Sequence, residues 1–168
     1  SQGAGVGTQS SGAACSPLCP ATVDVGDILS VHAYFEETTT TPDTPGGWTL
    51  LTGPVDVTTV SRHWVYGKIA DGTEDGAAVA LGSQAVTTMR AGRVYSFSGR
   101  VAGTITELVT GFATTSHDTD PQMPTITTTE SGNLAIAFVC QNDNNSLTPA
   151  TGETGGDWTL PVAIYEDA

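Results

Sequence analysis

Apolar and polar residues alternate with a period of two in several short stretches of the chain. In the stretch VGDILSVHAYF, the odd-numbered residues from 29 to 35 would share one face, and the even-numbered residues from 28 to 34 the other. This period is that of a β-strand. Further strands are predicted at residues 46–51, 61–70, 77–82 and 92–99. No stretch keeps a helical period for more than one turn, so negligible helix is expected.

One string of residues occurs twice, as PGGWTL at 45–50 and as TGGDWTL at 154–160. Each copy follows an apolar strand that begins after a Gly-Asp or Gly-Asn pair. The repeat indicates two related half-units, a first at 22–102 and a second, shorter one at 103–168. The glycines permit a tight turn or bulge, and each tryptophan is predicted to carry apolar surface into the core. The predicted core residues are Trp48, Trp158, Ile28, Leu29, Val31, Leu134, Ile136 and Phe138.

The composition favours strands and turns over helices. Only 14% of the 168 residues are charged, 20 are glycine and 9 are proline, and threonine is abundant. This length suits one ordinary domain with a single core. We therefore predict an all-β chain, an antiparallel two-sheet sandwich of jelly-roll or immunoglobulin-like form.

The acidic and basic residues are unevenly distributed. The formal net charge is −13, and residues 101–168 contain nine acids and no base. Because that half would repel phosphate, the sequence argues against a nucleic-acid partner. The basic residues form a candidate patch for acidic neighbours, although ordinary surface charges are the simpler interpretation. They are Arg62, Lys68, Arg90, Arg93 and Arg100.

An extended N-terminal arm is predicted at residues 1–21. Its first 14 residues hold a single valine among small and polar residues and cannot bury enough apolar surface to order themselves. We expect the arm to leave its own domain and contact a neighbouring chain. A candidate disulfide between Cys15 and Cys19 would make it a clasp, with pairing to Cys140 as the alternative. Cys140 ends an apolar run and is more simply a buried thiol.

The sequence contains no pattern typical of catalysis, a cofactor or a metal. It has no nucleophile elbow, phosphate loop or His-Glu zinc helix, and an enzyme is not expected. His32 and His63 are interpreted as ordinary strand residues. His117 lies near two aspartates, but a polar turn explains that cluster better than a cation site. No apolar run approaches the roughly 20 residues of a membrane-spanning helix, so we expect no membrane partner.

The order of motifs resembles a group of bacteriophage virion structural proteins. The matching stretches are VGDILSVHAYF, GGWTLL, SRHWVYGKIADG and RVYSFSG, followed by SGNLAIAFV and DWTL in the second half. The resemblance implies a β-sandwich that decorates a capsid or forms part of a tail fibre, located on the virion surface. It also implies other virion proteins as partners and a homo-oligomer in a symmetric assembly.

Two other function classes remain open from the sequence. One is a carbohydrate-binding module, since the tryptophans and tyrosines could stack on a glycan, although aromatic residues in strands are more often core. The other is a subunit of a non-viral extracellular filament. The second half-unit lacks counterparts of the later strands in the first. We expect either a longer natural chain or a strand donated by a neighbouring subunit.

Overall fold

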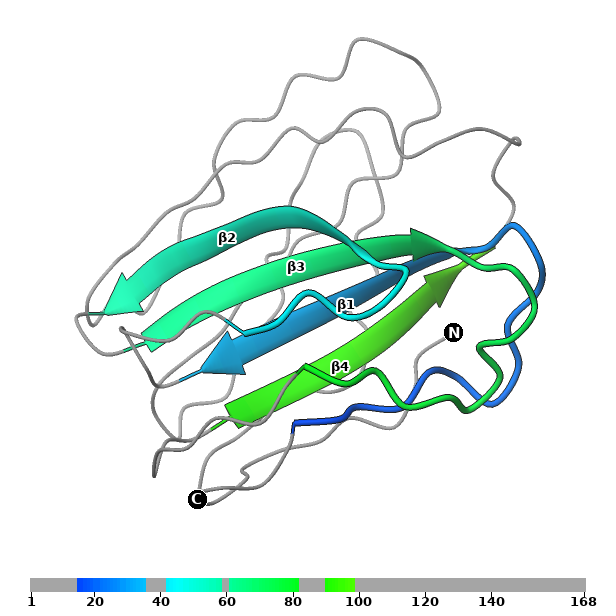
Figure 1. Cartoon of the computed structure of the whole chain (residues 1–168), viewed down its shortest axis with the longest axis horizontal. Helices are drawn as coiled ribbons and strands as arrows, with labels where there is room; N and C mark the ends of the chain where they lie inside the picture. The colour runs from blue at the N-terminus through cyan, green and yellow to red at the C-terminus, as the bar shows by residue number, and fades with distance from the viewer. Residues whose placement is uncertain (1–14, 36–41, 59–60, 82–89, 99–168) are drawn as a thin grey trace, which may run out of the picture.

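The computed structural model describes residues 15–35, 42–58, 61–81 and 90–98. These residues contain four antiparallel strands. They lie side by side in one sheet in the order β2-β3-β1-β4 (Figure 1). The strands are β1 (Ile28–Phe35), β2 (Thr49–Thr58), β3 (Ser61–Ile69) and β4 (Arg90–Phe97). The described residues contain no helix, so the all-β prediction is confirmed for them.

Strand β1 pairs with both β3 and β4, and this register determines which residues share a face. Val31 lies opposite Tyr66 of β3 and Val94 of β4. Since directly opposed residues point to the same side of a sheet, these three side chains share one face, and all are buried. That face carries the core. Successive residues of β1 lie on opposite faces as predicted, but burial does not alternate: Leu29 and Val31 on the core face are both 0% exposed, and Ser30 and Tyr34 on the other face are also buried.

A second layer covers the core face, formed by residues 15–20 and 76–81. These two segments run antiparallel, and their backbone hydrogen bonds link Cys19 to Ala77, Val79 to Pro17 and Leu81 to Cys15. Figure 1 shows the dark-blue segment beside the green segment that follows β3. Residues 15–20 are therefore part of the domain. The last residues of the predicted arm, 15–20, thus pair with the chain after β3, and residues 1–14 lie outside the described part.

The core cluster joins the sheet to this second layer. It contains Cys15, Cys19, Val23, Leu29, Val31, Ala33, Phe35, Trp64, Tyr66, Ala70, Val79, Leu81 and Val94. Trp48 is only partly buried and packs against the cluster, and Ile28 is likewise only partly buried. Both were predicted to be mostly buried, but Ile28 falls on the face of β1 opposite the core. The remaining predicted core residues, Leu134, Ile136, Phe138 and Trp158, lie outside the described residues.

The candidate disulfide between Cys15 and Cys19 is not formed, and both residues are buried thiols. The reason is the extended pairing of residues 15–20 with the chain after β3. An extended segment rises about 3.3 Å per residue, so positions four apart are separated by about 13 Å. A disulfide needs Cα atoms within about 7 Å. The Cys-x-x-x-Cys spacing thus places two thiols on the same buried side of a strand-like segment, without closing a loop.

Strand β2 lies at one edge of the described sheet. Three register shifts interrupt its pairing with β3, and Pro54 within it lacks a backbone donor. Irregular pairing and proline are typical of protected edges, because both hinder the addition of another strand. Gly53 allows the bulged path, since its φ of 127° lies where side-chain-bearing residues are strained.

Candidate functional site

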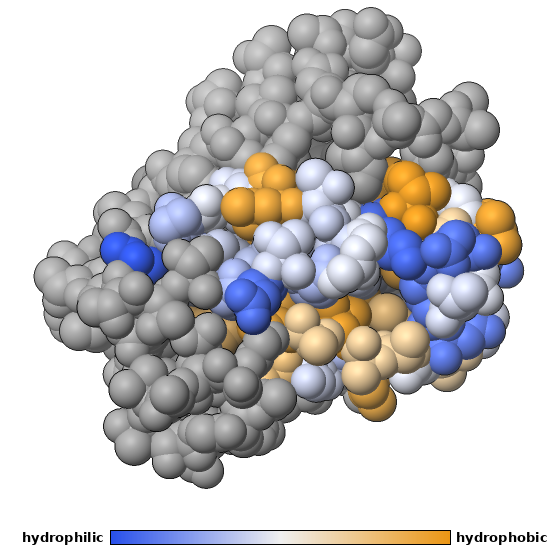
Figure 2. Space-filling model, viewed as in Figure 1, coloured by the Kyte–Doolittle hydropathy of each residue, from blue (hydrophilic) through white to orange (hydrophobic). Residues whose placement is uncertain are grey.

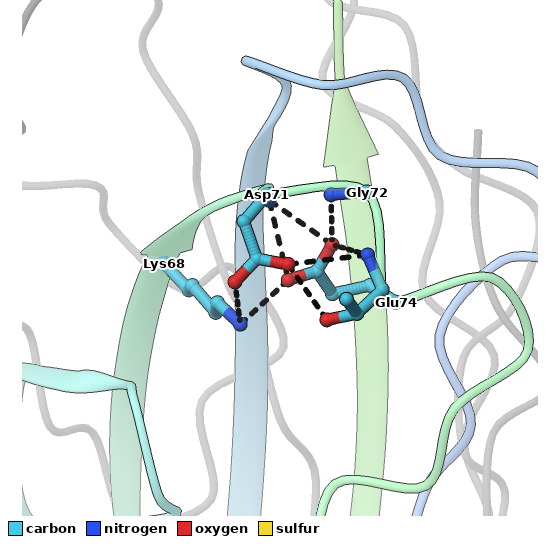
Figure 3. A network of polar contacts seen from close by, with 5 residues as sticks. Lys68, Asp71, Gly72 and Glu74 are labelled. Carbon is cyan, nitrogen blue, oxygen red and sulfur yellow. Dashed lines mark hydrogen bonds and ion pairs between the residues drawn. The ribbon is translucent and has the colours of Figure 1, made fainter.

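The densest described polar cluster lies in the turn after β3. Glu74 is only 4% exposed, and its carboxylate accepts hydrogen bonds from the backbone N–H groups of Asp71, Gly72 and Thr73. The Lys68 Nζ lies 2.5 Å from Glu74 Oε1 and 3.1 Å from Asp71 Oδ2 (Figure 3). The side chain of Glu74 therefore occupies the centre of the turn and organises its backbone.

The electrostatics of this cluster favour the ionised state of each partner. Burial raises the pKa of Glu74, but hydrogen bonds from Lys68 and the turn backbone outweigh burial and lower it. The bond to Glu74 raises the pKa of Lys68. The Thr73 hydroxyl and then Lys68 lower the pKa of Asp71 to about 2. A fully charged, paired cluster of this kind is suited to holding a turn, and is poorly suited to moving protons at neutral pH.

Further polar contacts tie the neighbouring turns to the sheet. Gly26 adopts a φ of 91°, and its N–H donates to the Ala70 carbonyl. The next residue, Asp27, is buried, and its carboxylate accepts a 2.6 Å hydrogen bond from the Ser96 hydroxyl of β4. The Asp75 carboxylate accepts a bond from the Val23 N–H. The Gly-Asp motif of the first half-unit is therefore a structural latch between the start of β1 and the end of β4.

Substitution of Asp27 by alanine is expected to lower the free energy of unfolding by about 2 kcal/mol. The buried Ser96 hydroxyl would lose its short bond to the Asp27 carboxylate, and a hydrogen bond to a charged group contributes about 1.5–3 kcal/mol. Asp27→Asn keeps an acceptor oxygen and should lose less. Urea unfolding of both variants measures the difference, and equal stability of Asp27→Ala and the unaltered chain would refute the latch.

Two histidines meet on the face of the sheet opposite the core. The His32 Nε2 lies 2.7 Å from the His63 Nδ1, and the rings are stacked with centroids 4.9 Å apart. Tyr34 contacts His63 edge-on at 5.3 Å. Burial, and then the neighbouring His63, hold the pKa of His32 well below its ordinary value, and burial lowers the pKa of His63 to about 4. The sequence pattern marked both only as separate strand residues.

The three basic residues whose side chains the structure describes do not lie on one face of the sheet. The pairing register places Lys68 and Arg62 opposite Leu29 and Phe35, on the core face, whereas Arg93 lies opposite His32, on the other face. Lys68 is also engaged by Glu74 and is only 17% exposed. For Arg90 the structure gives backbone pairing alone, and Arg100 lies outside the described residues.

The aromatic residues of the described strands contribute mainly to packing. Trp64 and Tyr66 are 0% and 1% exposed, and Phe35 packs edge-on against Trp64 at 5.4 Å. Tyr95 and Phe97 are partly buried and stack on each other. Figure 2 shows hydrophilic surface gathered at the right-hand end of the molecule, with orange apolar surface beside it. The described aromatic residues therefore do not favour a sugar-stacking platform.

The described residues hold neither a metal cluster nor a membrane-spanning helix. No group of three or more His, Cys, Asp or Glu residues among them could hold a metal ion. No helix among them is long and apolar enough to cross a membrane. The candidate cluster at His117 lies outside the described part.

Comparisons with known proteins found no match to this chain. No family model, no curated protein and no solved structure matches it.

Proposed function

We propose that this chain is a non-enzymatic structural protein of a bacteriophage virion, a capsid-decorating or tail-fibre module on the particle surface. The observation that carries the proposal is that the residues of the sequence motifs make structural contacts within the domain. Gly26 forms a turn, Asp27 binds Ser96, Trp48 packs on the core and Lys68 pairs with Glu74. The motifs on which the resemblance to virion modules rests thus stabilise the fold of the domain, as expected for a protein that acts through its surface.

The same proposal includes a two-sheet sandwich. Both faces of the described sheet carry buried side chains: Leu29 and Val31 on the core face, and Ser30 and Tyr34, at 3% and 7% exposure, on the other. A sheet that faced water on one side would alternate buried and exposed residues. Burial on both faces supports a further layer of the kind found in sandwiches.

A decorating or fibre module functions through repetition. Many small contacts, multiplied by copy number in a symmetric particle, give high avidity without any single strong interface. The paired turns and edge-protected β2 suit this role, because a module displayed in many copies has to resist unwanted strand addition.

The test is to locate the chain in purified particles from the culture that produces it. Particles separated on a density gradient are analysed by mass spectrometry and labelled with gold-conjugated antibodies against the full chain. We expect a fixed ratio of this chain to the major capsid or tail protein and regular labelling of the particle surface. Recovery only in fractions without particles, or labelling of cell-attached filaments, would overturn the proposal.

A further inference from the structure

The His32–His63 contact requires a defined arrangement of protons. At 2.7 Å, one ring nitrogen has to donate and the other has to accept. The His63 Nε2 is screened from solvent and has no hydrogen-bond partner. A buried donor without an acceptor is costly, so the proton of neutral His63 belongs on Nδ1. His63 Nδ1–H then donates to His32 Nε2, which leaves the proton of His32 on its own Nδ1.

One charged residue of the described strands shares the face of the histidine pair. Arg93 of β4 lies directly opposite His32 in the register and on the same face. Tyr34 of β1 and Tyr95 of β4 are the other titratable residues of the described strands on that face. The β2 residue opposite His63 is Val55, which carries no charge. The charged residues Lys68 and Arg62 belong to the core face.

We propose that His32 and His63 form an acid-sensitive lock between β1 and β3, closed while both imidazoles are neutral and opened by their protonation. An added proton sits either on His63 Nε2, which has no acceptor, or on His32 Nε2, where it converts the acceptor of the N–H···N bond into a donor. Protonation of both rings breaks the bond and sets two like charges side by side. This lock would act in the same way whether or not the chain belongs to a virion.

The direction of the pH dependence follows from the histidine equilibria. Unfolded histidine titrates near 6.5, whereas the pKa of folded His63 is lowered to about 4. Between these values the unfolded chain binds more protons, so stability falls as the pH falls. For His63 alone, the ratio of folded to unfolded chain should drop about thirtyfold from pH 7.5 to pH 5. His32 adds to the same direction.

The test compares the full chain with the double variant His32→Gln/His63→Asn. Glutamine can place an amide group near the former Nε2 and asparagine near the former Nδ1, so the variant keeps a hydrogen bond without a titratable group. Urea unfolding at pH 7.5, 6 and 5 measures the ratio of folded to unfolded chain for both proteins. Between pH 7.5 and pH 5 this ratio should fall about thirtyfold or more further in the unaltered chain than in the variant. Parallel profiles for the two proteins would overturn the lock.

A second measurement, the NMR titration of the histidines, uses the unaltered chain and therefore does not depend on the folding of a variant. In the full chain labelled with ¹³C and ¹⁵N in histidine, two of the three side chains should show no titration between pH 7.5 and 5. Their ¹⁵N shifts should place both protons on Nδ1. Titration of two or three histidines near pH 6.5, or Nε2–H tautomers for the non-titrating pair, would refute it.

Discussion

Replacing Glu74 by alanine should destabilise the domain by about 3 kcal/mol. The carboxylate is 4% exposed and is the shared acceptor for Lys68 and for three backbone N–H groups of the turn. Its removal leaves a largely buried ammonium without its closest partner, and breaking a buried pair from one side costs about 3–5 kcal/mol. The remaining exposure of Lys68 and its contact with Asp71 reduce that cost. Equilibrium unfolding in urea at pH 7 measures the change.

Asp71→Ala is the matched control for this prediction. Asp71 also contacts Lys68, at 3.1 Å, but its side chain is 58% exposed. Solvent screens exposed ion pairs, so this variant should remain much closer to the unaltered chain than Glu74→Ala does. Glu74→Gln should fall between the two, because an amide oxygen still accepts from the backbone but carries no charge for Lys68. Equal losses for the two acids would show that burial of Glu74 is unimportant.

Alanine at Gly53 should cost about 3–5 kcal/mol and is expected to be the most damaging single-methyl change in the described strands. The φ of 127° lies in a region that residues with a Cβ rarely adopt, a strain of about 1–3 kcal/mol. A Cβ there would also lie 2.8 Å from both the His63 carbonyl oxygen and the Trp64 Cδ1. Neither can yield easily, since one is backbone and the other belongs to a core side chain. Overpacking adds about 1–3 kcal/mol.

Gly46→Ala is the control, because Gly46 has an ordinary φ and an added methyl group there would meet no atom within 4 Å. It should change the free energy of unfolding by less than about 1 kcal/mol. Thermal and urea unfolding of both variants give the comparison, and a Gly53→Ala domain as stable as Gly46→Ala would show that β2 takes a different path past Trp64.

Several features of the fold could be predicted from local sequence. The alternation in residues 28–35 is a consequence of strand geometry, and β1 forms over these residues with Leu29 and Val31 on the core face. Ile28, which was also predicted to lie in the core, is on the opposite face. The Asp-Gly pairs at 71–72 and 75–76 are typical turn residues, and both glycines have positive φ in the turn that follows β3. Each of these patterns involves neighbours within a few residues, so the relevant sterics are visible in the sequence.

The polar contacts could not be predicted in the same way. His32 and His63 are 31 residues apart, and whether they touch depends on the register between β1 and β3. A shift of one residue would send the two rings to opposite faces. Likewise, Ser96 reaches Asp27 across 69 residues. No local pattern identifies these residues as partners, because strand pairing decides which distant residues come into contact.

By itself the sequence determined that the described residues form strands and turns and that successive residues of β1 face opposite sides, since backbone sterics and period-two patterning act locally. Only the tertiary structure decided that residues 15–20 pair with 76–81 and hold Cys15 and Cys19 too far apart to bond. The tertiary structure also decided that Lys68 forms an ion pair with Glu74. The reason is that both outcomes depend on which distant segments share buried surface and backbone hydrogen bonds, and those free energies are settled only when the whole domain packs.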